Sequence, residues 1–346
     1  MKLLLLGANG QVGRELRRAL TQTQTLSSFR RKPESIEFFA ETKMDSGLRR
    51  NDGDESFSLG EVILASRNGA LFDGSRGEVA DLAQPDTLPA LLDRIHPDII
   101  VNAAAHTAVD RAEDEPELAH RVNAEAVGVL ARWAAAHDAL MVHYSTDYVF
   151  DGQGNRPWRE DDPVAPLGVY GASKLAGEQA LHDSGAAHFL FRTAWVYAAH
   201  GHNFLKTMLR LGAERERLSV VDDQHGTPTP ASLIADVTAT VIGQWRASDT
   251  ATRAAQTGTW HLVADGHTTW CGFARAIMGE ATAMGLLPRA PQVDAITSAE
   301  FPTPAQRPAW SVLDTSRLRR TFGIELPRWE DGLKSVLADV LCSVSI

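Results

Sequence analysis

Tyr170 and Lys174 are two side chains whose types and spacing suit acid–base chemistry. Residues four apart share one face of a helix, so the phenol and the ammonium should lie side by side. The pKa of a free tyrosine is about 10, which is poorly matched to proton transfer at neutral pH. A lysine one turn away stabilises the phenolate, and we therefore expect Lys174 to lower the pKa of Tyr170. The pair predicts a phenol that gives a proton to a substrate oxygen.

A third polar side chain, Thr146, is expected to meet this pair. It lies in the run Ser145-Thr146-Asp147-Tyr148-Val149-Phe150, at the end of an apolar segment that is typical of a buried strand. The carboxyl ends of parallel strands meet at one edge of a sheet, so Thr146 and Tyr170 should come together there. A hydroxyl at that place can donate to a substrate carbonyl and stabilise the charge that develops when a hydride arrives. We therefore predict Tyr170, Lys174 and Thr146 as catalytic residues.

The beginning of the chain contains a glycine-rich turn, Gly7-Ala8-Asn9-Gly10-Gln11-Val12-Gly13, between an apolar run and a helical pattern. This spacing of glycines is a variant of the dinucleotide-binding fingerprint. The first glycine permits a tight turn, the second lets the backbone approach a pyrophosphate, and the third lets the helix pack on the strand. The helix N-terminus offers free N–H groups to the phosphates. The expected cofactor contacts are Gly7, Asn9, Gly10, Gln11, Val12 and Gly13.

The residues after the second strand should distinguish the two nicotinamide cofactors. A carboxylate there would bind the adenosine 2′-hydroxyl of NADH. The chain instead has Ser66 and Arg67, which could hold a 2′-phosphate, so NADPH is favoured and NADH stays an alternative. Further cofactor contacts are expected from Asp81 and Leu82 at the adenine, from the small residues Ala103, Ala104 and Ala105, from Tyr170, and from Lys174 at the nicotinamide ribose. The positively charged nicotinamide ring of the oxidised cofactor is expected to help Lys174 lower the pKa of Tyr170.

Alternating strand and helix patterns predict how these residues are brought together. Apolar strands are expected at residues 2–7, 62–65, 98–101, 139–145, 188–193 and 260–263, with helices at 12–20, 117–137, 171–181, 231–245 and 269–284. They indicate an α/β fold with a Rossmann-type doubly wound parallel sheet. Residues 1–195 are expected to form the cofactor-binding domain. Residues 196–346 should be mainly a smaller α/β substrate-binding region, with part of that chain returning to the sheet.

Residues 22–59 do not fit this alternation. A strand should follow the first helix soon, but the segment is rich in Ser, Arg, Lys, Glu and Asp and has no strand pattern. Loops of this length are uncommon in compact domains. We interpret the segment as a surface insertion that is disordered or loosely helical.

The composition restricts the class of protein. The 346 residues are 44% hydrophobic and 23% charged, with a formal net charge of -10. This acidic total argues against nucleic acid or an anionic membrane as a partner, because either would need a basic patch. The apolar start ends at Gly7, and no run approaches the roughly 18 residues that span a bilayer. Cys271 and Cys342 cannot form a disulfide framework, so we expect a cytoplasmic protein with a small-molecule substrate.

The glycine turn, Thr146 and the Tyr170–Lys174 pair together resemble the extended short-chain dehydrogenase/reductase superfamily. Longer runs resemble, within it, the dTDP-4-dehydrorhamnose reductase family. These runs are residues 97–110 (PDIIVNAAAHTAVD), 145–150 (STDYVF), 191–197 (FRTAWVY), 203–204 (NF), 223–229 (DQHGTPT) and 302–308 (PTPAQRP). The resemblance covers nearly the whole chain outside residues 22–59.

This resemblance implies an enzyme that reduces the C4 keto group of dTDP-4-dehydro-β-L-rhamnose with NAD(P)H. That reaction is the last step of dTDP-L-rhamnose synthesis for cell-surface polysaccharide. The resemblance implies that Tyr170 protonates the alkoxide, activated by Lys174, and that Thr146 contacts the carbonyl. Implied substrate contacts are Thr146, Asp147, Trp195 as a platform for the deoxysugar, Asn203, and Arg307 as a candidate for the diphosphate.

Some members of the family bind magnesium at a dimer interface through carboxylates. Glu15 fits that role, but Ser232 stands where another acid would be needed. We therefore predict no metal and leave a homodimer open.

Two other functions share parts of this pattern. An epimerase or 4,6-dehydratase belongs to the same superfamily, but a dehydratase needs an Asp-Glu pair after the catalytic threonine, and Asp147 is followed by Tyr148. A non-catalytic regulatory subunit would keep the cofactor site without turnover. The intact Thr146, Tyr170 and Lys174 favour an enzyme.

Overall fold

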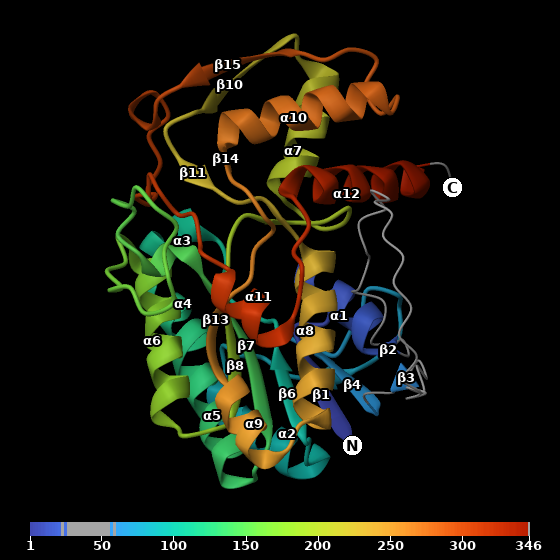
Figure 1. Ribbon diagram of the computed structural model, residues 1–346, viewed down its shortest axis with the longest axis vertical. Helices are drawn as coiled ribbons and strands as arrows, with labels where there is room; N and C mark the ends of the chain where they lie inside the picture. The colour runs from blue at the N-terminus through green and yellow to red at the C-terminus, as the bar shows by residue number, and fades with distance from the viewer. Residues whose placement is uncertain (22–23, 26–55, 58–59, 345–346) are drawn as a thin grey trace, which may run out of the picture.

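A sheet of seven parallel strands forms the centre of the larger, lower part of the molecule (Figure 1). The computed structural model describes residues 1–21, 24–25, 56–57 and 60–344. In sheet order the strands are β13 (Gly258–His261), β8 (His188–Thr193), β7 (Leu140–Thr146), β6 (Ile99–Asn102), β1 (Lys2–Leu6), β4 (Glu61–Ser66) and β5 (Glu78–Val79). The order reverses between β1 and β6, which is the topological switch point of a doubly wound sheet. The predicted fold class is confirmed.

Side chains of β1 alternate between the two faces of the sheet, as the strand period requires. Leu3 and Leu5 join a core that contains Leu16 of α1 (Gln11–Thr21) and Val237 of α8 (Ala231–Ala247). Leu4 and Leu6 join a second core, with residues of α2 (Leu88–Ile95), α5 (Ala126–Ala136) and α6 (Val169–Asp183). Helices thus cover both faces, which explains why the strands are apolar without interruption.

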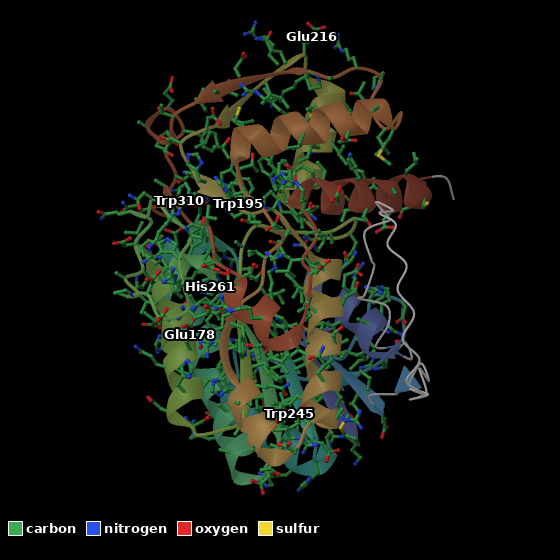
Figure 2. All side chains as sticks on the ribbon, viewed as in Figure 1. Glu178, Trp195, Glu216, Trp245, His261 and Trp310 are labelled. Atoms are coloured by element: carbon green, nitrogen blue, oxygen red, sulfur yellow. The ribbon has the colours of Figure 1, made fainter. Side chains whose placement is uncertain are left out.

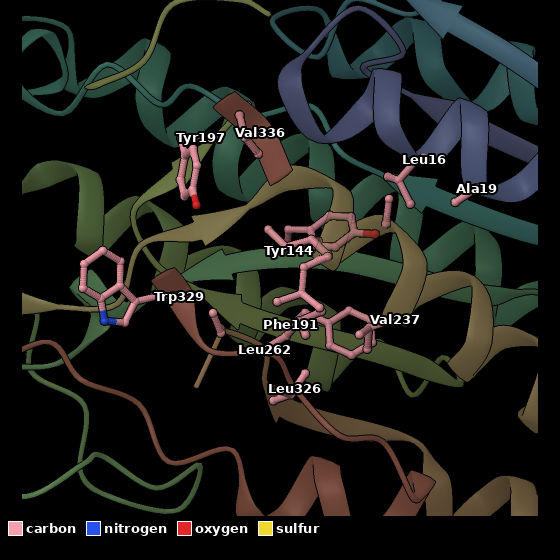
Figure 3. Close-up of a cluster of buried hydrophobic side chains, with 14 of the residues drawn as sticks. Leu16, Ala19, Tyr144, Phe191, Tyr197, Val237, Leu262, Leu326, Trp329 and Val336 are labelled. Carbon is pink, nitrogen blue, oxygen red and sulfur yellow. The ribbon is translucent and has the colours of Figure 1, made fainter. Parts of the chain in front are cut away.

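Aromatic and aliphatic side chains from distant parts of the chain fill the first core (Figure 3). Tyr144 and Phe191 point from β7 and β8 toward Val237 of α8, and their rings stack with centroids 6.0 Å apart. Trp329 and Val336 reach the same core from α12 (Trp329–Val344). This core therefore extends from the sheet to the C-terminal helix.

A smaller region above the sheet is built mainly from the second half of the chain (Figure 1). It contains the parallel pair β10 (Arg217–Val221) and β15 (Gln292–Ile296), with α7 (Phe204–Glu214) and α10 (Trp270–Ala283). Short strand pairs connect it to the sheet: β9 (Val196–Tyr197) with β12 (Thr229–Pro230), and β11 (His225–Gly226) with β14 (Thr268–Thr269). At the lower end of the sheet α9 (Thr250–Gln256) links α8 to β13, and α11 (Ser316–Phe322) packs against β13.

Parts of the second half also return to the sheet. Strand β13 pairs with β8, and α8 lies beside α1. The division of the chain into two domains at residue 195 stays a prediction.

Most of the segment 22–59 lies outside the described residues. Where it is described, β2 (Gln24–Thr25) pairs antiparallel with β3 (Ser56–Phe57), although the sequence showed no strand pattern there. Among the helices in the described part of the chain, none has both the length and the apolar character that crossing a membrane requires.

The helix α6, which carries Tyr170 and Lys174, packs its backbone closely against the backbone of a neighbouring helical segment. The predicted helix 117–137 contains α4 (Pro116–His120), a π-helical turn (Arg121–Glu125) and α5, preceded by α3 (Val109–Asp114). A Cβ on Gly177 of α6 would lie 2.1 Å from the carbonyl oxygen of Asn123 in the π-helical turn. Such turns are frequent at functional sites. The absence of a side chain at Gly177 therefore allows α6 to approach the π-helical turn this closely.

We predict that Gly177→Ala destabilises the protein by at least about 1–3 kcal/mol, because the added methyl group overpacks this contact. Gly279→Ala in α10 is the matched control, since a Cβ there would meet nothing within 4 Å. It should be neutral, or stabilise by about 0.5–1 kcal/mol through helix propensity. Urea unfolding of both variants measures the difference, and equal stabilities would contradict this account of the packing.

Candidate active site

A cavity of about 960 Å³ opens at the carboxyl edge of the sheet, at the switch point between β1 and β6. Most of the predicted site residues line it. They are Gly7, Asn9, Gly10, Gln11, Val12, Ser66, Arg67, Asp81, Leu82, Ala103, Ala104, Ala105, Thr146, Asp147, Tyr170, Lys174, Trp195 and Asn203. Two predicted residues, Gly13 and Arg307, do not line it.

The glycine turn brings backbone atoms close together. Gly7 has φ +77°, and a Cβ on it would lie 2.7 Å from the nitrogen of Ala104. Gly13 lies behind the turn, where a Cβ would be 2.0 Å from the carbonyl oxygen of Gly7. Only glycine fits either place, so α1 begins directly at the cavity with its N–H groups directed toward it.

Asn9 connects this turn to the loop that follows β4. Its Nδ2 donates to the carbonyl of Ala70 (2.8 Å), and its Oδ1 accepts from the N–H of Phe72 (3.0 Å). The side chain of Asn9 therefore fixes the rim of the cavity that contains Ser66 and Arg67.

The residues at this rim differ in whether their polar atoms already form hydrogen bonds with the protein. The hydroxyl of Ser66 donates to the carbonyl of Ala70 (2.8 Å), and Asp81 accepts from the N–H of Ala83 (3.0 Å). Arg67 is exposed at the wall of the cavity. A phosphate needs hydrogen-bond donors, so Arg67 suits a 2′-phosphate better than Ser66 does.

Tyr170 does not have the lowered pKa that the sequence predicted. Burial raises the pKa of its phenol to about 12, and the neighbouring Thr146 hydroxyl lowers it only in part. Lys174 is not directed at the phenol, because its Nζ donates to the main-chain carbonyl of Tyr144 at 2.6 Å. The part of the prediction that rests on Lys174 was wrong, because desolvation outweighs the effect of a lysine held elsewhere, and the contribution of the oxidised nicotinamide ring stays a prediction. A raised pKa keeps the phenol protonated at neutral pH, as a proton donor requires.

Lys174 is itself buried, with 2% of its surface exposed. Burial lowers the pKa of its amine to about 8, although Glu178 acts in the opposite direction. Glu178 is already paired with Arg192, at 2.7 Å between Oε2 and Nη2. The charge on Lys174 is therefore only partly compensated by its surroundings.

Thr146 and Asp147 lie where β7 ends. The Thr146 hydroxyl donates to Oδ1 of Asp147 (2.9 Å) and accepts from the N–H of Tyr148 (3.2 Å). Burial raises the pKa of Asp147 to about 6, and Oδ2 has no hydrogen-bond partner. A buried hydroxyl and a carboxyl with a free oxygen thus face the same cavity as Tyr170.

Trp195 lies between the sheet and the upper region (Figure 2). Its backbone has φ +47°, which is rare for a large side chain and indicates strain. Its indole stacks on that of Trp270, with centroids 3.6 Å apart and planes 5° apart. A Cβ on Gly226 would lie 2.4 Å from this indole. The stacked pair therefore forms a rigid aromatic wall of the cavity.

The side chains of the two remaining predicted substrate contacts form hydrogen bonds or an ion pair with other residues of the protein. Asn203 caps α7 by accepting from the N–H of Lys206 (3.0 Å), and its Nδ2 donates to Oε1 of Gln11 (2.7 Å). Arg307 forms a two-point ion pair with Asp110, at 2.8 and 3.0 Å. Asn203 thus joins the upper region to the glycine turn, and Arg307 joins residues 302–308 to α3. Their substrate roles stay predictions.

Sequence reasoning missed several residues that position the site. The carboxylate of Glu113 accepts from the N–H of Val169 (2.9 Å) at the start of α6. Asn123 donates to the carbonyl of His106 (3.0 Å) and to the hydroxyl of Ser173 (3.0 Å). His143 contacts Lys174 from β7. No local pattern marks these contacts, because each joins segments far apart in the chain.

Glu15, the candidate carboxylate for magnesium, accepts from Nε of Arg18 (3.1 Å). In the described residues no group of three or more His, Cys, Asp or Glu side chains is arranged to hold a metal ion. The predicted absence of a metal stays a prediction.

We predict that Asp147→Asn changes how stability depends on pH. The pKa of Asp147 is raised in the folded protein, so the folded protein binds this proton more tightly than the unfolded chain does. The free energy of unfolding of the wild type should therefore fall as the pH rises from about 4 through about 6. The amide in the variant does not titrate, so the stability of the variant should not fall for this reason. Relative to wild type, the variant should gain about 2–3 kcal/mol between about pH 4 and pH 8. Urea unfolding across this range measures the gain, and a difference independent of pH would contradict it.

Comparisons with known proteins find relatives that match over nearly the whole chain. The family model described as RmlD substrate binding domain matches residues 1–342. The dTDP-4-dehydrorhamnose reductase of Salmonella typhimurium is 41% identical over 346 residues, which cover all of both chains.

Two solved structures are similar over nearly the whole chain. The crystal structure of a dTDP-4-dehydrorhamnose reductase from Clostridium acetobutylicum has a TM-score of 0.77 and 32% identity, covering 99% of this chain and 100% of that one. The dTDP-4-dehydrorhamnose reductase from Bacillus anthracis in complex with NADP has a TM-score of 0.74 and 28% identity, covering 98% and 99%. The chain therefore belongs to the dTDP-4-dehydrorhamnose reductase family.

Proposed function

We propose that this protein reduces the C4 keto group of dTDP-4-dehydro-β-L-rhamnose to give dTDP-L-rhamnose, with NADPH as the preferred hydride donor and Tyr170 as the proton donor. The observation that carries the proposal is one cavity that joins the glycine turn to Tyr170, Thr146 and Lys174. The family supports the substrate, since its members named above are reductases of that sugar nucleotide.

The cavity fits a nicotinamide dinucleotide. Gly7 and Gly13 leave no side chain between the start of α1 and the ends of β1 and β6, so a pyrophosphate can approach the N–H groups of the turn. Lys174 lies at the other end, where it can hold ribose hydroxyls. A reduced nicotinamide bound there supplies the hydride. The complex of the Bacillus anthracis relative with NADP supports this choice of cofactor.

The protein groups then complete the reduction. Hydride addition to the carbonyl carbon moves the π electrons to the oxygen, which becomes an alkoxide. The Thr146 hydroxyl donates to that oxygen, and the Tyr170 phenol transfers its proton to it, leaving a phenolate and an alcohol. Because burial keeps the phenol protonated, the donor is ready at neutral pH. Lys174 stabilises the phenolate electrostatically.

The stacked indoles of Trp195 and Trp270 suit the apolar face of a deoxysugar. The strained backbone at Trp195 holds its ring on this wall. We assign Trp195 as the sugar platform and Asp147, next to Thr146, as a further sugar contact.

We predict that Tyr170→Phe lowers kcat by about 10²–10⁴-fold while NADPH binding changes little, because only the transferable proton is removed. The assay follows NADPH absorbance with freshly made dTDP-4-keto-L-rhamnose. Tyr197→Phe is the control, since Tyr197 is a buried tyrosine outside the cavity whose hydroxyl has no partner. Undiminished turnover in Tyr170→Phe would exclude its role as the proton donor. Cofactor binding by wild type without any oxidation would instead favour a regulatory subunit.

Arg67→Ala should raise KM for NADPH by about 10-fold or more and leave KM for NADH nearly unchanged, because only NADPH carries the 2′-phosphate. Arg76→Ala is the matched control, since Arg76 is an exposed arginine of the same loop that does not line the cavity. Equal changes in KM for both cofactors would show that Arg67 does not read the 2′-phosphate.

A further inference from the structure

Two buried polar residues that do not line the cavity, Asn102 and His143, belong to a chain of hydrogen bonds that ends at Lys174. The main-chain N–H of Ala104 donates to Oδ1 of Asn102 (3.1 Å), and Nδ2 of Asn102 faces Nδ1 of His143 (3.2 Å). Nε2 of His143 then faces Nζ of Lys174 (3.4 Å). Asn102 and His143 are paired residues of β6 and β7, and both are almost completely buried. The chain therefore joins the loop after β6 to the lysine through the centre of the sheet.

The direction of this chain is fixed at its first member. A peptide N–H can only donate, so Asn102 turns its oxygen to Ala104 and its NH₂ group to the imidazole. An NH₂ group is a donor, so this contact is a hydrogen bond only when Nδ1 of His143 accepts; in the other tautomer the ring N–H would donate to the main-chain carbonyl of Asn102 instead. Burial holds the pKa of His143 well below its usual value, although a hydrogen bond to the main chain of Asn102 acts in the opposite direction, so the ring is neutral and carries one hydrogen. With Nδ1 as the acceptor, that hydrogen is on Nε2, which faces Lys174.

Lys174 therefore meets an N–H on one side and a carbonyl on the other. The carbonyl is that of Tyr144, which accepts from Nζ at 2.6 Å. An ammonium has donors only, whereas a neutral amine has two donors and a lone pair. The neutral amine can donate to Tyr144 and accept from His143, but the ammonium can satisfy only Tyr144.

We propose that Asn102 and His143 are positioning residues that present an N–H to Lys174 and thereby favour the neutral amine of this lysine in the free protein. The burial of Lys174 acts in the same direction. When the pKa of a lysine is close to neutral pH, a new charge nearby can change its protonation state. A phenolate at Tyr170, on the same helix, would favour the ammonium form of Lys174. The inference goes beyond the proposed function, because it concerns a proton of the free protein and its test needs no turnover.

The other titratable groups around Lys174 do not reverse this direction. On α6, Glu178 raises the pKa of Lys174, but two of its hydrogen bonds from Arg192 of β8 (2.7 and 3.0 Å) offset its charge. Also on β8, His188 lowers the pKa of His143 and so keeps the imidazole neutral. After β7, burial favours the neutral form of Asp147. Tyr170 stays protonated at neutral pH.

The test is an NMR titration of the free protein labelled with ¹³C-lysine. The chain has only six lysines, so the Cε signals are few, and the signal lost in Lys174→Met identifies Lys174. His143→Leu removes the N–H donor and should raise the pKa of Lys174 by about one. A lower pKa would mean that Nε2 accepts from an ammonium, with Nδ1–H turned to the nearby main-chain carbonyl of Asn102, and would overturn the proposal. An unchanged pKa would overturn it as well.

Asn102→Asp tests the direction of the chain without removing the imidazole. A carboxylate accepts from both the Ala104 N–H and Nδ1–H, so it would turn the lone pair of Nε2 to Lys174. The pKa of Lys174 should then rise more than in His143→Leu, and an unchanged value would contradict the proposal. Thr238→Val is the control, because it removes another buried hydroxyl, which contacts the Tyr144 hydroxyl at 2.9 Å. A rise of similar size in this control would assign the effect to loosened packing and overturn the proposal.

Discussion

Backbone atoms at the end of β1 approach their neighbours more closely than any side chain would allow. The missing Cβ atoms of Gly7 and Gly13 let the turn contact Ala104 after β6 and let α1 start at the sheet. The position of the cavity depends on this contact, since it lies where the strand order reverses. The loop after β4 is tied to the same turn by Asn9, and the upper region by Asn203 through Gln11. The cofactor end of the site is thus assembled around one packing constraint.

The acid–base end depends on a second constraint, which is the exclusion of water. Burial raises the pKa of Tyr170 to about 12 and that of Asp147 to about 6, and it lowers the pKa of Lys174 to about 8. All three changes favour the neutral form. Charge that develops during a reduction would therefore interact strongly with the surrounding groups, because little solvent is present to screen it. In contrast, the buried pair Glu178–Arg192 is held by several hydrogen bonds, which permit both charges to stay.

Much of this arrangement could be predicted from the chain alone. The strands, the glycine turn and the helix with Tyr170 and Lys174 have local patterns, and the structure has them within a few residues of the expected bounds. The family expected from the motifs is confirmed by relatives that match over the whole chain. Lys174 was expected to lower the pKa of Tyr170, which is wrong, because the direction of the change depends on burial that spacing does not reveal. The roles of Asn203 and Arg307 stay open, since both side chains are engaged with distant residues of the chain.

The sequence by itself determined which chemical groups are present and which of them share an element. A helix fixes the spacing of Tyr170 and Lys174, and a strand followed by a helix fixes the glycine turn, so both can be read locally. Only the tertiary structure decided what surrounds those groups. Tyr144 and His143 contact Lys174 from β7, Asn102 contacts His143 from β6, and Trp270 stacks on Trp195 from a helix far along the chain. Protonation and orientation follow from such contacts, because desolvation and hydrogen-bond direction are properties of the packed fold and not of the order of residues.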